Sequence, residues 1–175
     1  MAENYVGVKF EIVRLPEEPI DDPRIGELIR AGRDLSARGF CPENSGNMSF
    51  RYVGGFVITR AGSRLGSLTR EDFVLVTDVD IAGKKVFAAG DGDPSSEAMM
   101  HFLIYAARKD ISVILHAHTL DLKGAIATRK IYPYGTPEFA RSAVEVLKNH
   151  DLAILKDHGF VSVGKTVPDA LTKVV

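Results

Sequence analysis

The sequence predicts an α/β fold built on a largely antiparallel sheet. Short apolar stretches with strand-like alternation dominate the first half, and segments with helical periodicity mix with strands in the second half. This order lacks the regular alternation of strand and helix that builds a parallel sheet. A length of 175 residues is sufficient for a core of good size, and we expect a single domain over residues 1–175.

The first half of the chain is predicted to hold one helix and five strands. The helix opens at Asp22-Pro23, where proline suits an early helical position, and Gly39 ends it. An apolar stripe of isoleucine and leucine runs along this helix. Gly54-Gly55 marks a hairpin turn between two strands. The expected strands cover residues 5–14, 48–52, 56–59, 73–78 and 84–88.

The second half is predicted to mix helices and strands. Asp93-Pro94-Ser95-Ser96-Glu97 is typical of a helix start, with serine caps and an acidic first turn. Pro137 and Pro168 open two further helices. The expected helices cover residues 93–108, 120–128 and 136–147 and a segment that begins at 168. The expected strands cover residues 113–118, 151–156 and 160–163.

The composition is that of an ordinary globular protein, with 45% hydrophobic and 26% charged residues. A net charge of -1 gives no general attraction to nucleic acid or to anionic membranes. The single cysteine, Cys41, excludes an intramolecular disulfide and fits a reducing compartment. The first residues lack the basic and apolar regions of a signal peptide. We therefore expect a cytoplasmic protein that binds neither nucleic acid nor membrane.

Histidines at the ends of predicted strands are the clearest chemical signal. His116 and His118 alternate along one strand, so both imidazoles leave the same face and provide half of a zinc site. His158 ends another apolar run, and Glu97 lies just upstream of the first pair. Three histidines with a movable carboxylate or water are typical of a catalytic metal centre. The alternative is a histidine pair bonded to backbone at the solvated end of a strand.

Small residues in loops and at helix starts are candidate anion ligands. Free N–H groups at helix N-termini bind phosphate, and glycine lets the backbone approach a ligand closely. Each of these residues could instead be a simple cap or turn, and no P-loop or dinucleotide-binding glycine pattern is present. The candidates are Gly46, Asn47, Thr59, Gly62, Ser95 and Ser96.

One further histidine, His101, lies four residues after Glu97 and therefore on the same helix face. It could support the metal site from a second layer of contacts. We favour the simpler interpretation, a local pair between the two side chains on the helix.

Five motifs in a fixed order resemble the class II aldolase/adducin family, and its L-fuculose-phosphate aldolase branch in particular. The likeness runs from about Arg24 to the C-terminus. The motifs are Gly46-Asn47-Met48-Ser49, Ile58-Thr59-Arg60-Ala61-Gly62, Pro94-Ser95-Ser96-Glu97, His116-Ala117-His118 and His158-Gly159.

The resemblance implies a three-layer α/β/α sandwich with one Zn²⁺ ion per chain. It assigns His116, His118 and His158 to the metal, and makes Glu97 a carboxylate that both ligates the ion and acts as acid/base. The six candidate anion ligands match the family's phosphate-binding loops. The resemblance also implies a homotetramer with active sites between subunits.

The implied activity is that of a metal-dependent lyase. A class II aldolase cleaves a ketose 1-phosphate reversibly to dihydroxyacetone phosphate and an aldehyde. A methylthioribulose-1-phosphate dehydratase or a pentulose-phosphate 4-epimerase on the same fold is an alternative, although the epimerase branch tends to carry aspartate where this chain has Glu97. A non-catalytic, adducin-like interaction module is another, but such modules do not keep the metal ligands as a set.

The sequence departs from the family pattern at several positions. Ala61 stands where relatives commonly carry serine, which removes one hydroxyl from the expected phosphate pocket. Arg64 and Gly66 add features to the following loop that bear on specificity. Some relatives place a C-terminal tyrosine in a neighbouring site, and this sequence has no counterpart. Tyr132 and Tyr134 lie in a loop from which one of them could replace it.

Overall fold

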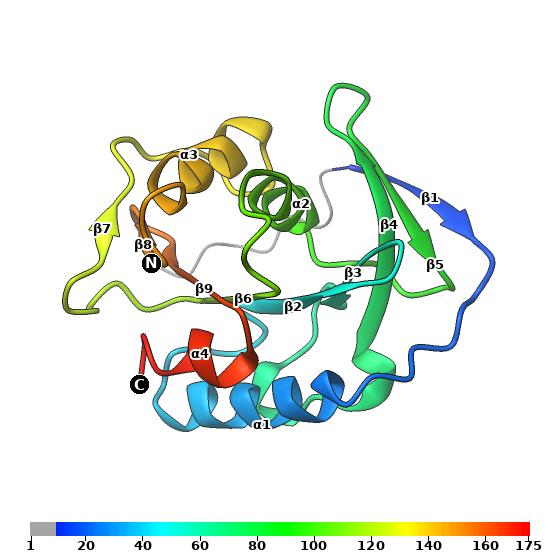
Figure 1. The fold of residues 1–175 in the computed structure, drawn as a ribbon, viewed down its shortest axis with the longest axis horizontal. Coiled ribbons are helices and arrows are strands. Elements are labelled where there is room, and N and C mark those ends of the chain that lie inside the picture. Colours follow the sequence, from blue (N-terminus) through cyan, green and yellow to red (C-terminus); the bar gives the residue numbers. More distant parts are fainter. Residues whose placement is uncertain (1–9) are drawn as a thin grey trace.

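A nine-stranded sheet forms the middle of the molecule in the computed structural model, which describes residues 10–175 (Figure 1). Neighbouring strands are antiparallel except for the pairs β1–β5 and β7–β8 at the two edges. The strand order is β1-β5-β4-β3-β2-β6-β9-β8-β7. The strands are β1 (Glu11–Leu15), β2 (Asn47–Tyr52), β3 (Gly55–Thr59), β4 (Phe73–Asp80), β5 (Lys85–Ala89), β6 (Val113–Ala117), β7 (Ile126–Ala127), β8 (Leu152–Leu155) and β9 (Gly159–Gly164).

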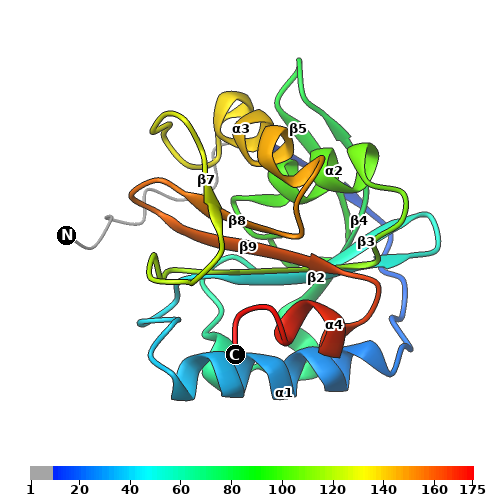
Figure 2. The same cartoon turned by 60° about the vertical axis from the view of Figure 1, so that its left-hand side comes forward.

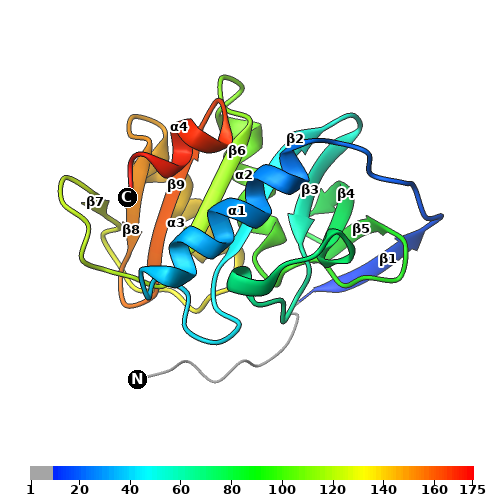
Figure 3. The ribbon, with the colours of Figure 1, turned by 90° about the horizontal axis from the view of Figure 1, so that it is seen from below.

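Helices cover both faces of the sheet (Figures 1 and 2). On one face lie α1 (Arg24–Ala37) and α4 (Val167–Leu171), which run beside each other beneath the central strands (Figure 3). On the other face lie α2 (Ala98–Ala107) and α3 (Pro137–Leu147). A separate buried apolar cluster fills each space between helices and sheet. The predicted α/β/α sandwich with a largely antiparallel sheet is confirmed.

Local sequence accounts for most of these elements. Helix α1 buries Ile25, Leu28 and Leu35 along one stripe, and the positive φ of Gly39 follows its end, as the periodicity predicts. Gly32 lets the same helix approach the 3₁₀ turn at Leu65–Ser67, because a Cβ there would lie 2.3 Å from the Leu65 carbonyl oxygen. Central strand β2 begins with four buried residues because helices cover both of its faces.

Three expectations need correction or restriction. The segment 120–128 is not a helix: it is a loop that ends in β7, and Gly124 takes a φ of +78°, which no α-helix accommodates. Helix α2 begins at Ala98 rather than near 93, because Asp93 and Ser95 exchange backbone hydrogen bonds with the end of β3 and the residues just after it. The part of the predicted first strand before residue 10 lies outside the described residues.

No helix among residues 10–175 combines the length and the apolar character needed to cross a membrane. The longest, α1, has 14 residues and is charged on its outer face.

Candidate active site

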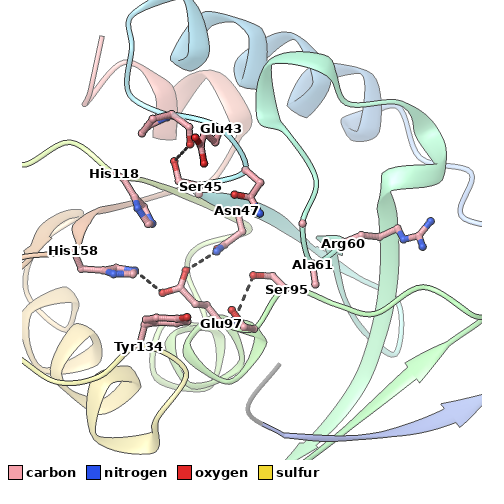
Figure 4. A pocket seen from close by; sticks show the side chains of 15 residues that line it. Glu43, Ser45, Asn47, Arg60, Ala61, Ser95, Glu97, His118, Tyr134 and His158 are labelled. Atoms are coloured by element: carbon pink, nitrogen blue, oxygen red, sulfur yellow. Dashed lines mark hydrogen bonds and ion pairs between the residues drawn. The ribbon is translucent and has the colours of Figure 1, made fainter. Parts of the chain in front are cut away.

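Ends of several elements meet around one cavity (Figure 4). His116 and His118 lie at the C-terminal end of β6, and His158 lies in the turn between β8 and β9. Asn47 opens β2 directly opposite His116 in the antiparallel pair β2–β6. Glu97 immediately precedes α2, and its side chain points toward His158 and Asn47 in Figure 4 and also contacts His116. Residues far apart in the sequence therefore share one site.

The three predicted histidine ligands come together. One ring nitrogen from each of His116, His118 and His158 lies within 4.8 Å of the others. The rings also pack closely, with His116 and His158 stacked at 5.0 Å between centroids. Convergent imidazole nitrogens at this spacing form a donor set that a divalent metal ion accepts.

The hydrogen bonding of His116 provides a test of that fit. Its Nδ1–H donates to the Phe160 carbonyl at 2.6 Å, which in a neutral ring leaves a lone pair on Nε2. Nε2 is fully buried, lies 3.1 Å from a Glu97 carboxylate oxygen and has no hydrogen-bond partner among the described residues. A lone pair that faces a carboxylate in a buried site is repulsive unless a cation lies between them. The residues therefore fit a metal ion.

Glu97 is a buried carboxylate held from two sides. Oε1 lies 2.9 Å from His158 Nε2, and Oε2 accepts a 2.5 Å hydrogen bond from the Asn47 amide. Burial alone raises the pKa of Glu97, but positive charge at the positions of His116 and His158 outweighs that effect and holds the pKa well below its usual value. The ionised carboxylate is available as a fourth metal ligand or as a base.

His118 is neutral at physiological pH. Burial lowers its pKa to about 3, and repulsion from His116 and His158 acts in the same direction. A neutral imidazole is the form that binds a metal ion.

Two glycines allow the close approach of these segments. A Cβ on Gly159 would lie 2.2 Å from the Ala117 carbonyl oxygen, so only glycine lets the start of β9 lie against the end of β6. Gly46 has a φ of +84°, and a Cβ there would lie 2.6 Å from the His116 carbonyl oxygen. Asp157 adopts a φ of 58° in the tight turn before His158. The backbone around the site is thus specified by residues that are not ligands.

A cavity of about 230 Å³ opens beside the histidines. Five of the six candidate phosphate ligands line it, namely Gly46, Asn47, Gly62, Ser95 and Ser96. Thr59 does not: it is 1% exposed, and its hydroxyl accepts a hydrogen bond from the Met48 backbone N–H. We assign Thr59 to holding β2 against β3, which corrects the expectation that it contacts an anion.

The end of the cavity farthest from the histidines is small and polar. Ala61 contributes a methyl group there, while the Arg60 side chain turns away from the cavity and its guanidinium approaches the Glu71 carbonyl (Figure 4). Ser95 accepts a hydrogen bond from the Glu97 backbone N–H. This end therefore offers hydroxyl groups and small side chains to a ligand.

The two candidate tyrosines have different environments. Tyr134 lines the cavity and stacks on His158 with a centroid distance of 5.8 Å, and Figure 4 shows its ring beside Glu97. Both tyrosines pack against the apolar cluster under α2 and α3, but Tyr132 does not line the cavity. Only Tyr134 is placed to meet a ligand, and the sequence alone did not distinguish the two.

His101 differs from our expectation of a local pair. Its ring nitrogens lie 2.6 Å from Asn47 Oδ1 and 2.6 Å from Ser49 Oγ, so its partners belong to β2 rather than to its own helix. This geometry matches the other interpretation, in which His101 supports the metal site from a second layer of contacts.

The sequence model of one protein family, the class II aldolase and adducin N-terminal domain, matches residues 26–130 and 120–175 of this chain. The chain belongs to the class II aldolase/adducin family. The resemblance stated from the five motifs is confirmed.

Several members of the family are similar over most of their length. A methylthioribulose-1-phosphate dehydratase of Methylococcus capsulatus is 33% identical, over 87% of this chain and 88% of its own. An L-fuculose phosphate aldolase of Methanocaldococcus jannaschii is 30% identical, over 85% of this chain and 88% of its own. The crystal structure of L-fuculose-1-phosphate aldolase from Thermus thermophilus is 26% identical with a TM-score of 0.67, over 87% of this chain and 88% of its own.

Proposed function

We propose that this class II aldolase family member is a Zn²⁺-dependent lyase that cleaves a ketose 1-phosphate to dihydroxyacetone phosphate and an aldehyde. The observation that carries the proposal is the buried Glu97 carboxylate facing three convergent histidines beside a cavity with hydroxyl groups at its far end. The likeness to the Methanocaldococcus jannaschii L-fuculose phosphate aldolase supports this reaction class.

His116, His118 and His158 would hold the metal ion, with Glu97 as an exchangeable fourth ligand. A bound Zn²⁺ supplies Lewis-acid polarisation of a carbonyl oxygen. The Phe160 carbonyl orients the His116 ring by accepting from Nδ1, as partners of metal-bound histidines generally do.

The protein's own groups would carry the protons. Cleavage of the C3–C4 bond removes the proton of the C4 hydroxyl, which becomes the aldehyde oxygen, and delivers a proton to C3. We assign the C3 proton to Glu97, which returns it in cleavage and removes it in synthesis. We assign the C4 hydroxyl proton to Tyr134, because its ring stacks on His158 and lines the cavity.

The rest of the cavity would position the substrate. Ser95, Ser96, Gly46 and Gly62 would hold the phosphate away from the bond that breaks, whereas the Asn47 side chain, which also lines the cavity, is held by Glu97 and His101. Fixing a non-reacting group in this way lowers the entropic barrier of the chemical step. With Ala61 in place of a serine, we expect the phosphate to rely more on Ser95 and Ser96.

A second candidate function is dehydration of methylthioribulose 1-phosphate. The observation that favours it is the 33% identity to the Methylococcus capsulatus dehydratase. That reaction would use the same metal ligands and the same carboxylate, so the two candidates differ in the bond that breaks rather than in the site.

One assay separates these functions. The Zn²⁺-loaded protein is incubated with L-fuculose 1-phosphate and with methylthioribulose 1-phosphate. Dihydroxyacetone phosphate is measured by coupled reduction with NADH, and loss of one water is measured by mass spectrometry. Release of dihydroxyacetone phosphate supports the aldolase, and loss of water without cleavage supports the dehydratase. A protein that binds no metal and turns over neither substrate would instead fit an adducin-like interaction module.

We also propose a cytoplasmic homotetramer with sites at its subunit interfaces. The segment from 120 to 131, next to the site, exposes the large apolar side chains Leu120, Ile126 and Ile131. Exposed apolar groups that cluster on one segment are typical of a contact surface.

A further inference from the structure

A polar ladder connects Glu97 to the interior of the molecule between β2 and α2. One row lies on β2, where alternate residues face the same side: Asn47, Ser49 and Arg51. The other row lies on α2 and the residue before it, where residues four apart form one stripe: Glu97, His101 and Tyr105. A strand advances about 6.7 Å over two residues, and a helix advances about 6 Å over four residues. Successive members of the two rows therefore stay opposite each other.

Hydrogen bonds join these rows along most of their length. The Asn47 amide nitrogen lies 2.5 Å from Glu97, and the Asn47 oxygen lies 2.6 Å from His101 Nε2. His101 Nδ1 lies 2.6 Å from the Ser49 hydroxyl, which lies 2.8 Å from the Tyr105 hydroxyl. Ser49 and His101 have no exposed surface, and Asn47 and Tyr105 are each 4% exposed. The bonds are therefore shielded from water.

The chemistry of each group determines the direction of these bonds. An ionised carboxylate only accepts, so the Asn47 NH₂ faces Glu97 and its oxygen must accept from His101 Nε2–H. In a neutral ring, Nδ1 then accepts from the Ser49 hydroxyl. Ser49 is left to accept from Tyr105. From Tyr105 to Asn47, every donor in this series of hydrogen bonds points toward Glu97.

Two further observations support this arrangement. Burial lowers the pKa of His101 to about 3, so the ring is neutral at physiological pH. At the far end, the Arg51 guanidinium lies over the Tyr105 ring and donates to the carbonyls of Tyr105 and Arg108, each at 2.8 Å. Arg51 thus ties the C-terminal end of α2 to the strand that carries Asn47.

We propose that His101 is a positioning residue for Glu97, acting through Asn47 in its neutral Nε2–H tautomer. The His101 donor prevents the Asn47 amide from turning over and presenting its oxygen to the carboxylate. The ladder thereby holds Glu97 in one orientation while it exchanges between metal and substrate. The effect of His101 on catalysis rests on the proposed function, whereas the tautomer of the His101 ring does not depend on it.

The first test is the tautomer itself. We would record long-range ¹H–¹⁵N correlation spectra of the full-length protein labelled with ¹⁵N-histidine, with and without added Zn²⁺. We expect His101 to show a protonated Nε2 and an unprotonated Nδ1 in both samples. His150→Gln, at an exposed position outside the site, assists assignment. An Nδ1–H tautomer or a doubly protonated ring would overturn the proposal, whatever the protein catalyses.

The second test compares two variants at the same position. In His101→Leu the donor is lost, and we expect kcat to fall about 10- to 100-fold with little change in KM. In His101→Gln the side-chain amide replaces the Nε2–H donor, and we expect most of the lost turnover to return. Equal losses in both variants, or no loss in His101→Leu, would contradict positioning through Asn47. Thermal unfolding of each variant shows whether it folds, and the spectra of the unsubstituted protein remain decisive if one does not.

Discussion

Glu97 combines two properties that rarely occur in one side chain. It is 4% exposed, yet contacts with His116 and His158 keep its pKa low. A buried carboxylate without such partners would take up a proton and lose its value as a base or a metal ligand. The surrounding residues therefore determine which chemistry this one group can perform.

Replacing the carboxylate by its amide tests the proposed proton transfer. Glu97→Gln keeps the shape of the side chain and leaves all three histidines in place, so we expect the protein to retain about one Zn²⁺ per chain. An amide cannot carry the proton, and we expect kcat to fall at least about 100-fold. Metal analysis and the dihydroxyacetone phosphate assay measure the two effects, and full activity in this variant would refute the role of Glu97.

Removing one imidazole tests the metal site. In His158→Ala two histidines are left, and we expect Zn²⁺ affinity to fall by more than the roughly 100-fold that loss of an outer hydrogen-bond partner costs. Isothermal titration with Zn²⁺ measures the change. His150→Ala, at an exposed position, is the matched control and should bind as the unsubstituted protein does. Equal affinity in the two variants would exclude His158 as a ligand.

Individual elements position the site through backbone contacts as well as side chains. No residue of helix α1 lines the cavity, but the helix packs under the segment that leads from the β2–β3 hairpin to β4. Gly32 lies where helix and segment meet, and Gly26 lies in the same helix with ordinary space around it. The two glycines allow packing and helix propensity to be separated within one element.

Alanine substitutions at these glycines should have opposite effects. Gly32→Ala forces a Cβ toward the Leu65 carbonyl oxygen, and we expect the free energy of unfolding to fall by about 1–3 kcal/mol. In Gly26→Ala the nearest atom is 3.7 Å from the new Cβ, and we expect a gain of about 0.5–1 kcal/mol. Urea unfolding measures both, and changes of the same sign would contradict this account of α1.

The start of α1 should make stability depend on pH. The Asp22 carboxylate accepts from both the backbone N–H and the guanidinium of Arg24, which holds the pKa of Asp22 below its usual value. A lowered pKa stabilises the fold above the pKa of the unfolded chain, near 4, and that contribution is lost as pH falls through the folded pKa. Asp22→Asn should cost about 0.5–1 kcal/mol at pH 7, with the difference shrinking below pH of about 4. If the difference in stability between the two proteins stayed constant down to acidic pH, the charge of Asp22 would not be the source of the stabilisation.

The proposed assembly of four chains requires a contact surface on each chain. The proposed tetramer would cover the segment from 120 to 131, which carries exposed apolar side chains. This segment lies in the chain between His118 and Tyr134, two residues that line the cavity, so covering it would bring a partner chain close to the site. We therefore expect catalysis and assembly to depend on each other.

Light scattering after size exclusion tests that expectation. The unsubstituted protein should elute with four times the mass of one chain. Ile131→Glu places a charge on an apolar group that is 61% exposed in the isolated chain, and we expect smaller species and reduced turnover. Val53→Glu, at an 88% exposed position in the β2–β3 turn, should leave the mass unchanged. A monomeric unsubstituted protein with full activity would refute the tetramer.

Most of the fold was accessible from local pattern. Alternation and helical periodicity predicted every strand of the described residues except β7, and all four α-helices with small errors in their bounds, together with one helix, 120–128, that does not form. The failures lie where long-range contacts override local preference. Residues 120–128 have a helix-like composition, but pairing of β7 with β8 and the positive φ of Gly124 keep them out of a helix. Pairing with the end of β3 likewise delays the start of α2.

For the site, local sequence pattern was enough to identify the side chains with suitable chemistry. Alternation along β6 directs His116 and His118 to one face, and the five ordered motifs indicate the family. Which of the candidates meet depends on the fold, which turns Thr59 inward, selects Tyr134 over Tyr132 and joins His101 to β2. Local periodicity fixes the face from which a side chain leaves its own element, whereas its partners depend on the pairing of elements distant in sequence.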